Sequence, residues 1–545
     1  MENINSSIGV ELECVVGIQV GQNPRTKPRM FQTAKGNPIR FDDENYEWHL
    51  GTPPQVIDAI KQRIKEAVAG HEGDRIVNSE AELLGDQNSW HLKNFAVNWD
   101  VKRDASVYLN EEYAIRDSGF NNYHFVDIEI TSPALRATEN SYAEIHHVIT
   151  TLRDTFWLVT PRSAGLHVHY GRCKDWIPLD HLRRIAALLY AADPILIQIQ
   201  PAVRRLEGQR WCRSNRLYCN LAHGWRAQDA QESITRISRR PIEVELQPET
   251  VPESKVPEVE KTPRPSVKRS RNFTSIFPRG SLEGYAFSRR DFDASYQDYV
   301  VNRHSESHEG TPLGIIPAAR ELLSCVSAPI VSDLMGYKWV NRLAYNFNAY
   351  NHEHYRRFRM NRDQTINIDN QPKRTIEFRQ PAGTLNVDLI IATAKIVVRI
   401  CEFASTATAE ELWKLICDLD MAEKHREWYD VFDFLVDLDL DNEAKVIQRH
   451  MAEQRGLEII DEENGVVRIA TSNSAQPQQP VPSSYLGRFF SKLVLKPDQQ
   501  TPPNQSETGV TQGAPGGSQS PEISGSTDGD DLLWLELGTG PILPN

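Results

Sequence analysis

Three short segments, far apart along the chain, share one alternating pattern. In 9–14 (GVELEC), 165–170 (GLHVHY) and 375–379 (TIEFR), apolar residues alternate with acidic, imidazole or guanidinium side chains. Because side chains of a β-strand alternate between the two faces of a sheet, each segment predicts one apolar face and one polar pair. A fold that contains all three as strands therefore needs a sheet with a core on one side and reactive groups on the other.

The polar pairs have a chemistry in common. A fourth predicted strand, 126–131 (VDIEIT), adds two carboxylates and stops at Pro133. Carboxylates gathered on one sheet repel one another unless a cation compensates them, and hard ions such as Mg²⁺ take carboxylate oxygens. Imidazole is accepted by such sites, although it suits softer ions better. A site that combines carboxylates with a histidine and an arginine is suited to bind a nucleoside triphosphate together with its metal ions. Each segment alone is more typical of an amphipathic strand with its polar face in water, and only the combination favours a metal site.

Composition excludes several classes of function. The 545 residues include 61 Lys plus Arg and 74 Asp plus Glu, a net charge of −13, which argues against a general nucleic-acid binder. Seven scattered cysteines without CxxC or zinc spacing predict reduced thiols and a cytoplasmic localisation. A basic KRSRN at 268–272 leaves nuclear localisation as the alternative. We expect no signal peptide and no membrane span, since the most apolar helical stretch, 389–404, contains Lys395 and Arg399.

Periodicity predicts a mixture of helices and strands. Helices are expected at 54–69, 139–158, 179–199 with a kink at Pro194, 316–328 and most of 387–455; strands are expected at 8–16, 125–131, 165–170, 342–350 and 374–380. Within the C-terminal helices, the predicted core residues are Trp413, Leu415, Phe432, Phe434 and Leu435.

The chain divides by composition. The Pro-, Glu- and Lys-rich stretch 241–270 and the Ser-, Gln-, Pro- and Gly-rich tail cannot bury enough apolar surface to fold, so both are expected to be disordered. The predicted parts are a discontinuous catalytic domain (5–225 and 335–405), a linker (226–275), a partly helical insertion (276–334), a helical extension (406–470) and a tail (471–545). Two apolar islands in the tail, 483–496 and 530–538, are candidate docking motifs for a protein partner.

Five motifs in order carry a resemblance to a known family. They are GVELE, WDVKRDAS at 99–106, VDIEITSP, GLHVHY and TIEFRQPAGTLN at 375–386. The sequence resembles the amidoligase family over about 7–225 and 335–405. That family is similar to glutamine synthetases and glutamate–cysteine ligases, which are ATP-dependent carboxylate–amine ligases. The resemblance implies an α+β fold, in which a curved antiparallel sheet forms a funnel of the glutamine synthetase type with helices packed outside.

The resemblance also implies a mechanism and its residues. ATP would phosphorylate a carboxylate, and an amine would attack the acyl phosphate, with Mg²⁺ or Mn²⁺ as the metal. The substrates would be a small-molecule or peptide carboxylate and an amine. The implied metal ligands are Glu11, Glu13, Glu129, His167 and Glu377. His169 would face the ATP phosphates, and Arg379 would hold the γ-phosphoryl group or the acyl phosphate.

Further residues follow from the same resemblance. Asp104 and Ser106 occupy the family's Asp-x-Ser position and would contact the substrate or the amine; a local turn held by the Asp side chain is the alternative. Arg204 or Arg205 would reach phosphate, with a solvated helix end as the alternative. Asn346 and Asn348 would line the same cavity.

Two other functions fit the same residues. One is a catalytically silent scaffold that keeps the fold and binds partners through its linker and tail. The other is a metal-dependent hydrolase that uses the Glu/His cluster without ATP. The absence of a GxxxxGK[ST] motif argues against a P-loop enzyme.

Overall fold

The computed structural model describes twelve stretches of the chain: 5–21, 27, 31–41, 54–76, 97–107, 123–205, 212–238, 275–284, 313–337, 342–351, 374–461 and 466–469. All of them fall within one unit, Met1–Thr471. The Pro-rich stretch 241–270 and the two tail islands, 483–496 and 530–538, lie outside the described residues.

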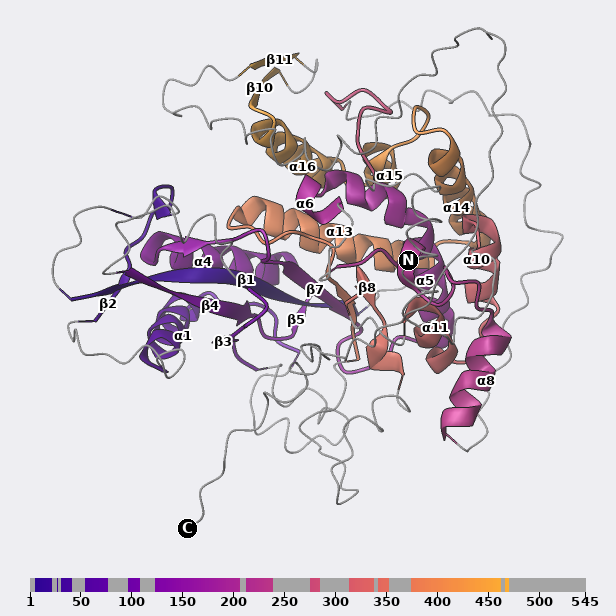
Figure 1. Cartoon of the computed structure of the whole chain (residues 1–545), viewed down its shortest axis with the longest axis horizontal. Coiled ribbons are helices and arrows are strands. Elements are labelled where there is room, and N and C mark those ends of the chain that lie inside the picture. The colour runs from indigo at the N-terminus through magenta and orange to yellow at the C-terminus, as the bar shows by residue number, and fades with distance from the viewer. Residues whose placement is uncertain are drawn as a thin grey trace, which may run out of the picture. The chain divides into compact units, whose positions relative to one another are not determined.

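A long strand, β1 (Ser7–Val20), is the centre of a mainly antiparallel sheet (Figure 1). The main path of the sheet runs β3 (Asp100–Arg103), β4 (Tyr123–Thr131), β1, β7 (Leu166–Gly171), β9 (Ile376–Phe378) and β8 (Tyr345–Asn346). Three short strands also pair with β1: β2 (Ile39–Phe41), in parallel, and β5 (Leu135–Arg136) and β6 (Leu158–Val159), both antiparallel. The main path has two ends that do not meet, so the sheet is open.

The apolar face of the sheet is the one that the alternation predicts. Its buried rows are Val10, Leu12, Cys14, Val16 and Ile18 in β1; Val126, Ile128 and Ile130 in β4; Leu166, Val168 and Tyr170 in β7; and Ile376 and Phe378 in β9. These side chains share one core with apolar residues of helices α1 (Pro54–Val68), α4 (Glu139–Thr155) and α13 (Val387–Thr406). Figure 1 shows α4 and α13 alongside the sheet. The observed class is therefore α+β, as predicted.

A second group of helices packs around α5 (Leu179–Leu196). Its neighbours are α10 (Ile315–Leu323), α11 (Ala328–Met335), α13 and α14 (Ala409–Lys424). After α14 come α15 (Val431–Asp437), α16 (Asp441–Gln454) and the strand pair β10 (Leu457–Asp461) and β11 (Val466–Ile469). The five C-terminal residues predicted to lie in the core are all buried. Shorter helices are α6 (Ala202–Arg205), α7 (Asn215–Tyr218) and α8 (Ala227–Ser238).

Three predicted elements differ from the observed ones. The helix expected at 316–328 ends at Leu323, and α11 begins after Ser327 with Pro329 in its first turn, because proline cannot continue a preceding helix. Pro194 does not interrupt α5, which changes after Leu196 into the 3₁₀ helix η5 (Ile197–Ile199). Within 342–350 only Tyr345–Asn346 is a strand, and η7 (Asn348–Tyr350) follows it.

None of the helices in the described part of the chain has the length and apolar character needed to cross a membrane. All seven cysteines lie in that part and are free thiols, and six of them are buried.

Candidate functional site

Strand register brings the polar pairs onto one face. Glu13 lies opposite Glu129 across β1 and β4, and Glu11 lies opposite His167 across β1 and β7. On the next strand Glu377 lies opposite His169 and also opposite Asn346 of β8. Because Cα partners of paired strands point their side chains to the same side of a sheet, five strands contribute to one polar surface.

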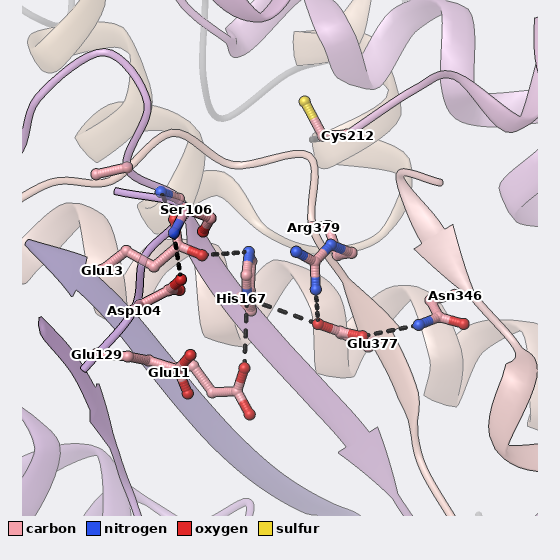
Figure 2. A network of polar contacts seen from close by, with 12 residues as sticks. Glu11, Glu13, Asp104, Ser106, Glu129, His167, Cys212, Asn346, Glu377 and Arg379 are labelled. Carbon is pink, nitrogen blue, oxygen red and sulfur yellow. Dashed lines mark hydrogen bonds and ion pairs between the residues drawn. The ribbon is translucent and has the colours of Figure 1, made fainter. Parts of the chain in front are cut away.

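His167 is at the centre of this surface (Figure 2). Its Nδ1 atom lies 3.3 Å from Glu11 Oε2 and 3.6 Å from Glu377 Oε1, and its Nε2 atom lies 3.4 Å from Glu13 Oε1. The second oxygen of Glu13 accepts a hydrogen bond of 2.5 Å from the backbone amide of Gly165. A side chain at position 165 would collide with the His167 ring, so glycine allows β1, β7 and the imidazole to approach one another.

His169 has a different environment. Its Nδ1 atom lies 3.1 Å from Thr375 Oγ1, and its Nε2 atom lies 3.0 Å from Glu11 Oε1. Despite that short distance, the buried Nε2 is not aligned for a hydrogen bond with any described residue. A proton on Nδ1 that is donated to Thr375 leaves the Nε2 lone pair available to a cation. Glu11, His169 and Glu377 each offer one ligand atom, and these atoms lie within 4.8 Å of one another.

Three of the four carboxylates are buried, and the fourth, Glu377, is largely shielded from water. Glu11, Glu13 and Glu129 are at most 6% exposed, and the Glu377 side chain is 13% exposed. Burial, and then the charge of Glu11, raise the pKa of Glu129. Burial also raises the pKa of Glu377, but Arg379 and the two histidines outweigh it and lower that pKa to about 2. Carboxylates withdrawn from water need a compensating charge, so this donor set fits a divalent cation.

Cations of the protein already touch the cluster. Arg379 donates from Nη1 to Glu377 Oε1, and Asn346 donates to Glu377 Oε2 at 2.9 Å. Lys102 of β3 lies opposite Glu129, with its Nζ atom 2.8 Å from Glu129 Oε1. Burial and the neighbouring charge of Arg379 lower the pKa of Arg342, whereas Asp104, Glu13 and Glu377 raise it, so Arg342 belongs to the same electrostatic neighbourhood.

The structure separates the two adjacent arginines. Arg204 is 3% exposed and donates to the backbone oxygen of Ala164 and, at 3.4 Å, to Cys212 Sγ. Its guanidinium lies beside Gly165, next to Glu13 and His167, and none of the described carboxylates forms an ion pair with it. Arg205 instead pairs with Glu283 at 2.9 Å in an exposed contact. Arg204 is thus the one of the pair that lies beside the cluster.

Asp104 and Ser106 form a local turn, since the Ser106 amide donates to Asp104 Oδ1 at 2.8 Å (Figure 2). Asp104 nevertheless interacts electrostatically with Lys102 and Arg342 at the edge of the cluster. Asn348 contacts the cluster only through Asn346, because the backbone amide of Asn348 donates to Asn346 Oδ1.

Three residues near the site were missed by sequence reasoning: Lys102, Arg342 and Thr375. Lys102 stands in the WDVKRDAS motif, and strand alternation there could have placed it on the same face as Asp104. Thr375 precedes the apolar–acidic alternation of its segment and has no signal of its own. Arg342 is the first residue of the segment 342–350, whose alternation predicts a strand but does not single out this arginine.

A small cavity of about 50 Å³ lies beside Glu11 and His169. Thr131, Ser132 and Thr375 supply polar atoms to its wall, and the remaining lining is mainly apolar, including Ile76, Pro133 and Ala134. This volume holds a few atoms rather than a nucleotide.

Comparison with known proteins gives one match. A family described as "putative amidoligase enzyme" matches residues 5–245, which confirms the family resemblance over that range. The matched range contains β1, β4 and β7 with their Glu and His pairs, and it ends before Glu377 and Arg379. No curated protein and no solved structure matches the chain.

Proposed function

We propose, from the premise that residues 5–245 are an amidoligase region, that the chain is an ATP- and Mg²⁺-dependent ligase that joins a carboxylate to an amine. The polar face of the sheet would be one wall of a funnel of the glutamine synthetase type. The observation that carries this proposal is the convergence of three buried carboxylates, the half-buried Glu377 and two histidines from four strands on one face.

Glu11, His169 and Glu377 would hold one divalent ion, and Glu13, Glu129 and His167 would complete the metal-binding surface. Mn²⁺ is the alternative ion, since imidazole suits it better than Mg²⁺. When bound, the metal neutralises phosphate charge and polarises the transferred phosphoryl group. Sequence reasoning assigned His169 to the phosphates and His167 to the metal; the orientation of His169 Nε2 toward Glu11 supports a metal role for His169 as well.

The arginines would bind the phosphoryl groups. In the first step an oxygen of the substrate carboxylate attacks the γ-phosphorus of ATP, the bond to the bridging oxygen breaks, and ADP leaves. Arg379 and the buried Arg204 are suited to stabilise the charge on the transferred group, because guanidinium remains protonated and presents several donors.

In the second step the amine nitrogen attacks the acyl carbon of the acyl phosphate. The bond between the acyl carbon and the phosphate oxygen breaks, an amide bond forms, and the nitrogen gives up one proton to the departing phosphate. Asp104, at the edge of the cluster, would orient the amine through its carboxylate. Burial of the polar face limits the access of water, which would otherwise hydrolyse the acyl phosphate.

Nucleotide and metal binding test this proposal. We expect Mg²⁺ with ATP to raise the midpoint of thermal unfolding, because a ligand bound only by the folded state adds about 2.7 kcal/mol at 100 times its dissociation constant. Glu11→Gln and Glu377→Gln should abolish the rise. Asp127→Asn is the matched control, since Asp127 lies on the same strand as Glu129 but pairs with Arg103.

Product analysis completes the test. A mixture of amino acids and small carboxylates should give ADP only when both an amine and a carboxylate are present, with the new amide detected by mass spectrometry. Stabilisation by metal alone, with no response to any nucleotide, would favour the hydrolase. Absence of both metal and nucleotide binding would favour the silent scaffold.

A further inference from the structure

The Glu129 side of the cluster already contains a cation of the protein. Lys102 Nζ lies 2.8 Å from Glu129 Oε1, and the Thr131 hydroxyl donates to the same oxygen at 3.0 Å. The pairing is set by strand register, because Lys102 and Glu129 are Cα partners across β3 and β4. An ammonium group on a carboxylate that belongs to a metal-binding surface competes directly with the metal.

The charges of the cluster show what this competition means. Glu11, Glu13, Glu129 and Glu377 bring four carboxylates together, and among the described residues Lys102 forms an ion pair with Glu129 and Arg379 forms one with Glu377. A divalent ion at Glu129 would meet the ammonium of Lys102 as a like charge, so the two cations compete for one carboxylate.

Lys102 is the cation that can leave. The Lys102 side chain is 53% exposed, and its ammonium group stands on a flexible aliphatic stem. The Arg379 side chain, in contrast, is only 15% exposed. The ammonium end of the pair can move into water, but the Glu129 side chain is only 9% exposed, so its carboxylate needs another cation in the place of Lys102. A divalent ion bonded to Glu129 Oε1 would lie within about 5 Å of the ammonium if Lys102 stayed, given Mg²⁺–oxygen distances of about 2.1 Å.

We propose that Lys102 is a displaceable counter-ion that keeps the Glu129 side of the cluster free of metal until a second divalent ion replaces it. The inference rests on the proposed metal-dependent function. It makes metal loading ordered: the ion held by Glu11, His169 and Glu377 binds first, and the ion at Glu129 binds second and more weakly. Once displaced, the ammonium of Lys102 is at the edge of the site, where it attracts an anionic substrate.

Mn²⁺ titration of the purified full chain, without nucleotide, tests this order. Free Mn²⁺ is counted by electron paramagnetic resonance, and folding of each variant is checked by its unfolding midpoint. The key variant is Lys102→Met, which keeps the length of the stem and removes the charge. The matched control is Arg103→Met, because Arg103 is 54% exposed and pairs with Asp127 at 3.1 Å on the neighbouring position of the same two strands.

We expect the wild type to bind one Mn²⁺ tightly and a second at least tenfold more weakly. Lys102→Met should tighten the second site by roughly tenfold and leave the first unchanged, while Arg103→Met should resemble the wild type. The gain should disappear in Lys102→Met/Glu129→Gln, because the second ion then lacks its carboxylate.

Equal second-site affinities in Lys102→Met and wild type would overturn the inference and leave the proposed metal-dependent function standing. The inference would also be overturned if Arg103→Met tightened the second site as much as Lys102→Met. In that case the loss of any nearby positive charge would raise the metal affinity, whether or not it pairs with Glu129. A wild type that binds no Mn²⁺ at all would contradict the proposed function, and the inference with it.

Discussion

Thr375 decides how His169 can act. The Thr375 hydroxyl lies 3.1 Å from His169 Nδ1, where it can accept the Nδ1 proton in the tautomer whose Nε2 carries a lone pair toward Glu11. His167, two residues away, has carboxylates near both ring nitrogens instead. His169 and His167 lie on the same strand, but their ring nitrogens have different partners: a hydroxyl and a carboxylate for His169, and carboxylates alone for His167.

Thr375→Val tests this contact. The substitution keeps the shape of the side chain and removes the hydroxyl, so we expect Mn²⁺ affinity to fall by about 10- to 100-fold, as for other partners of metal-binding histidines. Thr375→Ser should retain most of the affinity. Isothermal titration calorimetry measures both, and equal losses in the two variants would contradict the role of the hydroxyl.

His223 predicts a pH dependence away from the site. Burial lowers its pKa to about 4, and its ring stacks on Tyr337 at 4.7 Å between centroids. The folded protein resists protonation of this ring, whereas the unfolded chain takes up the proton below about pH 6.5. Stability is therefore lost as the pH falls from about 6.5 to 4, by up to about 3 kcal/mol from this residue.

Urea unfolding at pH 7 and pH 4.5 measures that loss. His223→Gln cannot titrate, so its free energy of unfolding should fall less than that of the wild type over this interval, whatever its stability at pH 7. Parallel pH profiles for the two proteins would contradict the assignment.

At the scale of elements, helix α4 fixes the segment that leads into β3. Glu144, fully buried in α4, accepts from Arg75 Nη1 and Nη2 at 2.5 and 2.7 Å and from Trp99 Nε1 at 2.6 Å. The Arg75 side chain is only 11% exposed. One carboxylate thus joins the helix, the segment around residue 75 and the start of the strand that carries Lys102.

Glu144→Gln should cost about 3 kcal/mol of unfolding free energy, because it leaves the Arg75 charge buried without its partner. Glu139→Gln is the matched control in the same helix: Glu139 is 82% exposed and pairs with Lys395, so its loss should cost well under 1 kcal/mol. Thermal and urea unfolding compare the two, and equal costs would show that the buried network contributes little.

At the scale of the whole molecule, the site joins strands from both ends of the folded unit. Glu11 comes from β1 and Glu377 from β9, and β7 lies between these strands. Both carboxylates lie near Nδ1 of His167, and they share the candidate metal group with His169. The cluster therefore exists only when the N-terminal and C-terminal parts of the sheet pair correctly.

A double-mutant cycle measures this dependence. Glu11→Gln and Glu377→Gln should each lower Mn²⁺ affinity at least tenfold, and the double variant should lose less than the product, with a coupling of about 1 kcal/mol or more, because both act on one ion. Asp127→Asn combined with Glu377→Gln is the control pair and should be additive. Additive losses for Glu11 and Glu377 would mean that they do not share a cation.

The sequence predicted the three strands of the site better than it predicted the segment 342–350 and the helix expected at 316–328. Alternation in 9–14, 165–170 and 375–379 correctly assigned the apolar side chains to the core, because each pattern is local and strong. The interval 342–350 alternates as well, yet only two of its residues pair, since β9 extends for just three residues beside it. The helix expected at 316–328 was wrong at Ser324–Ser327, where two short helices replace one.

The sequence by itself determined which side chains share a face, because the period of a strand is a property of its own backbone. Only the tertiary structure decided which strands are neighbours and in which register. That register puts Lys102 opposite Glu129, Thr375 behind His169 and Asn346 against Glu377. Such pairings depend on packing between separate segments of the chain, and no local pattern encodes them.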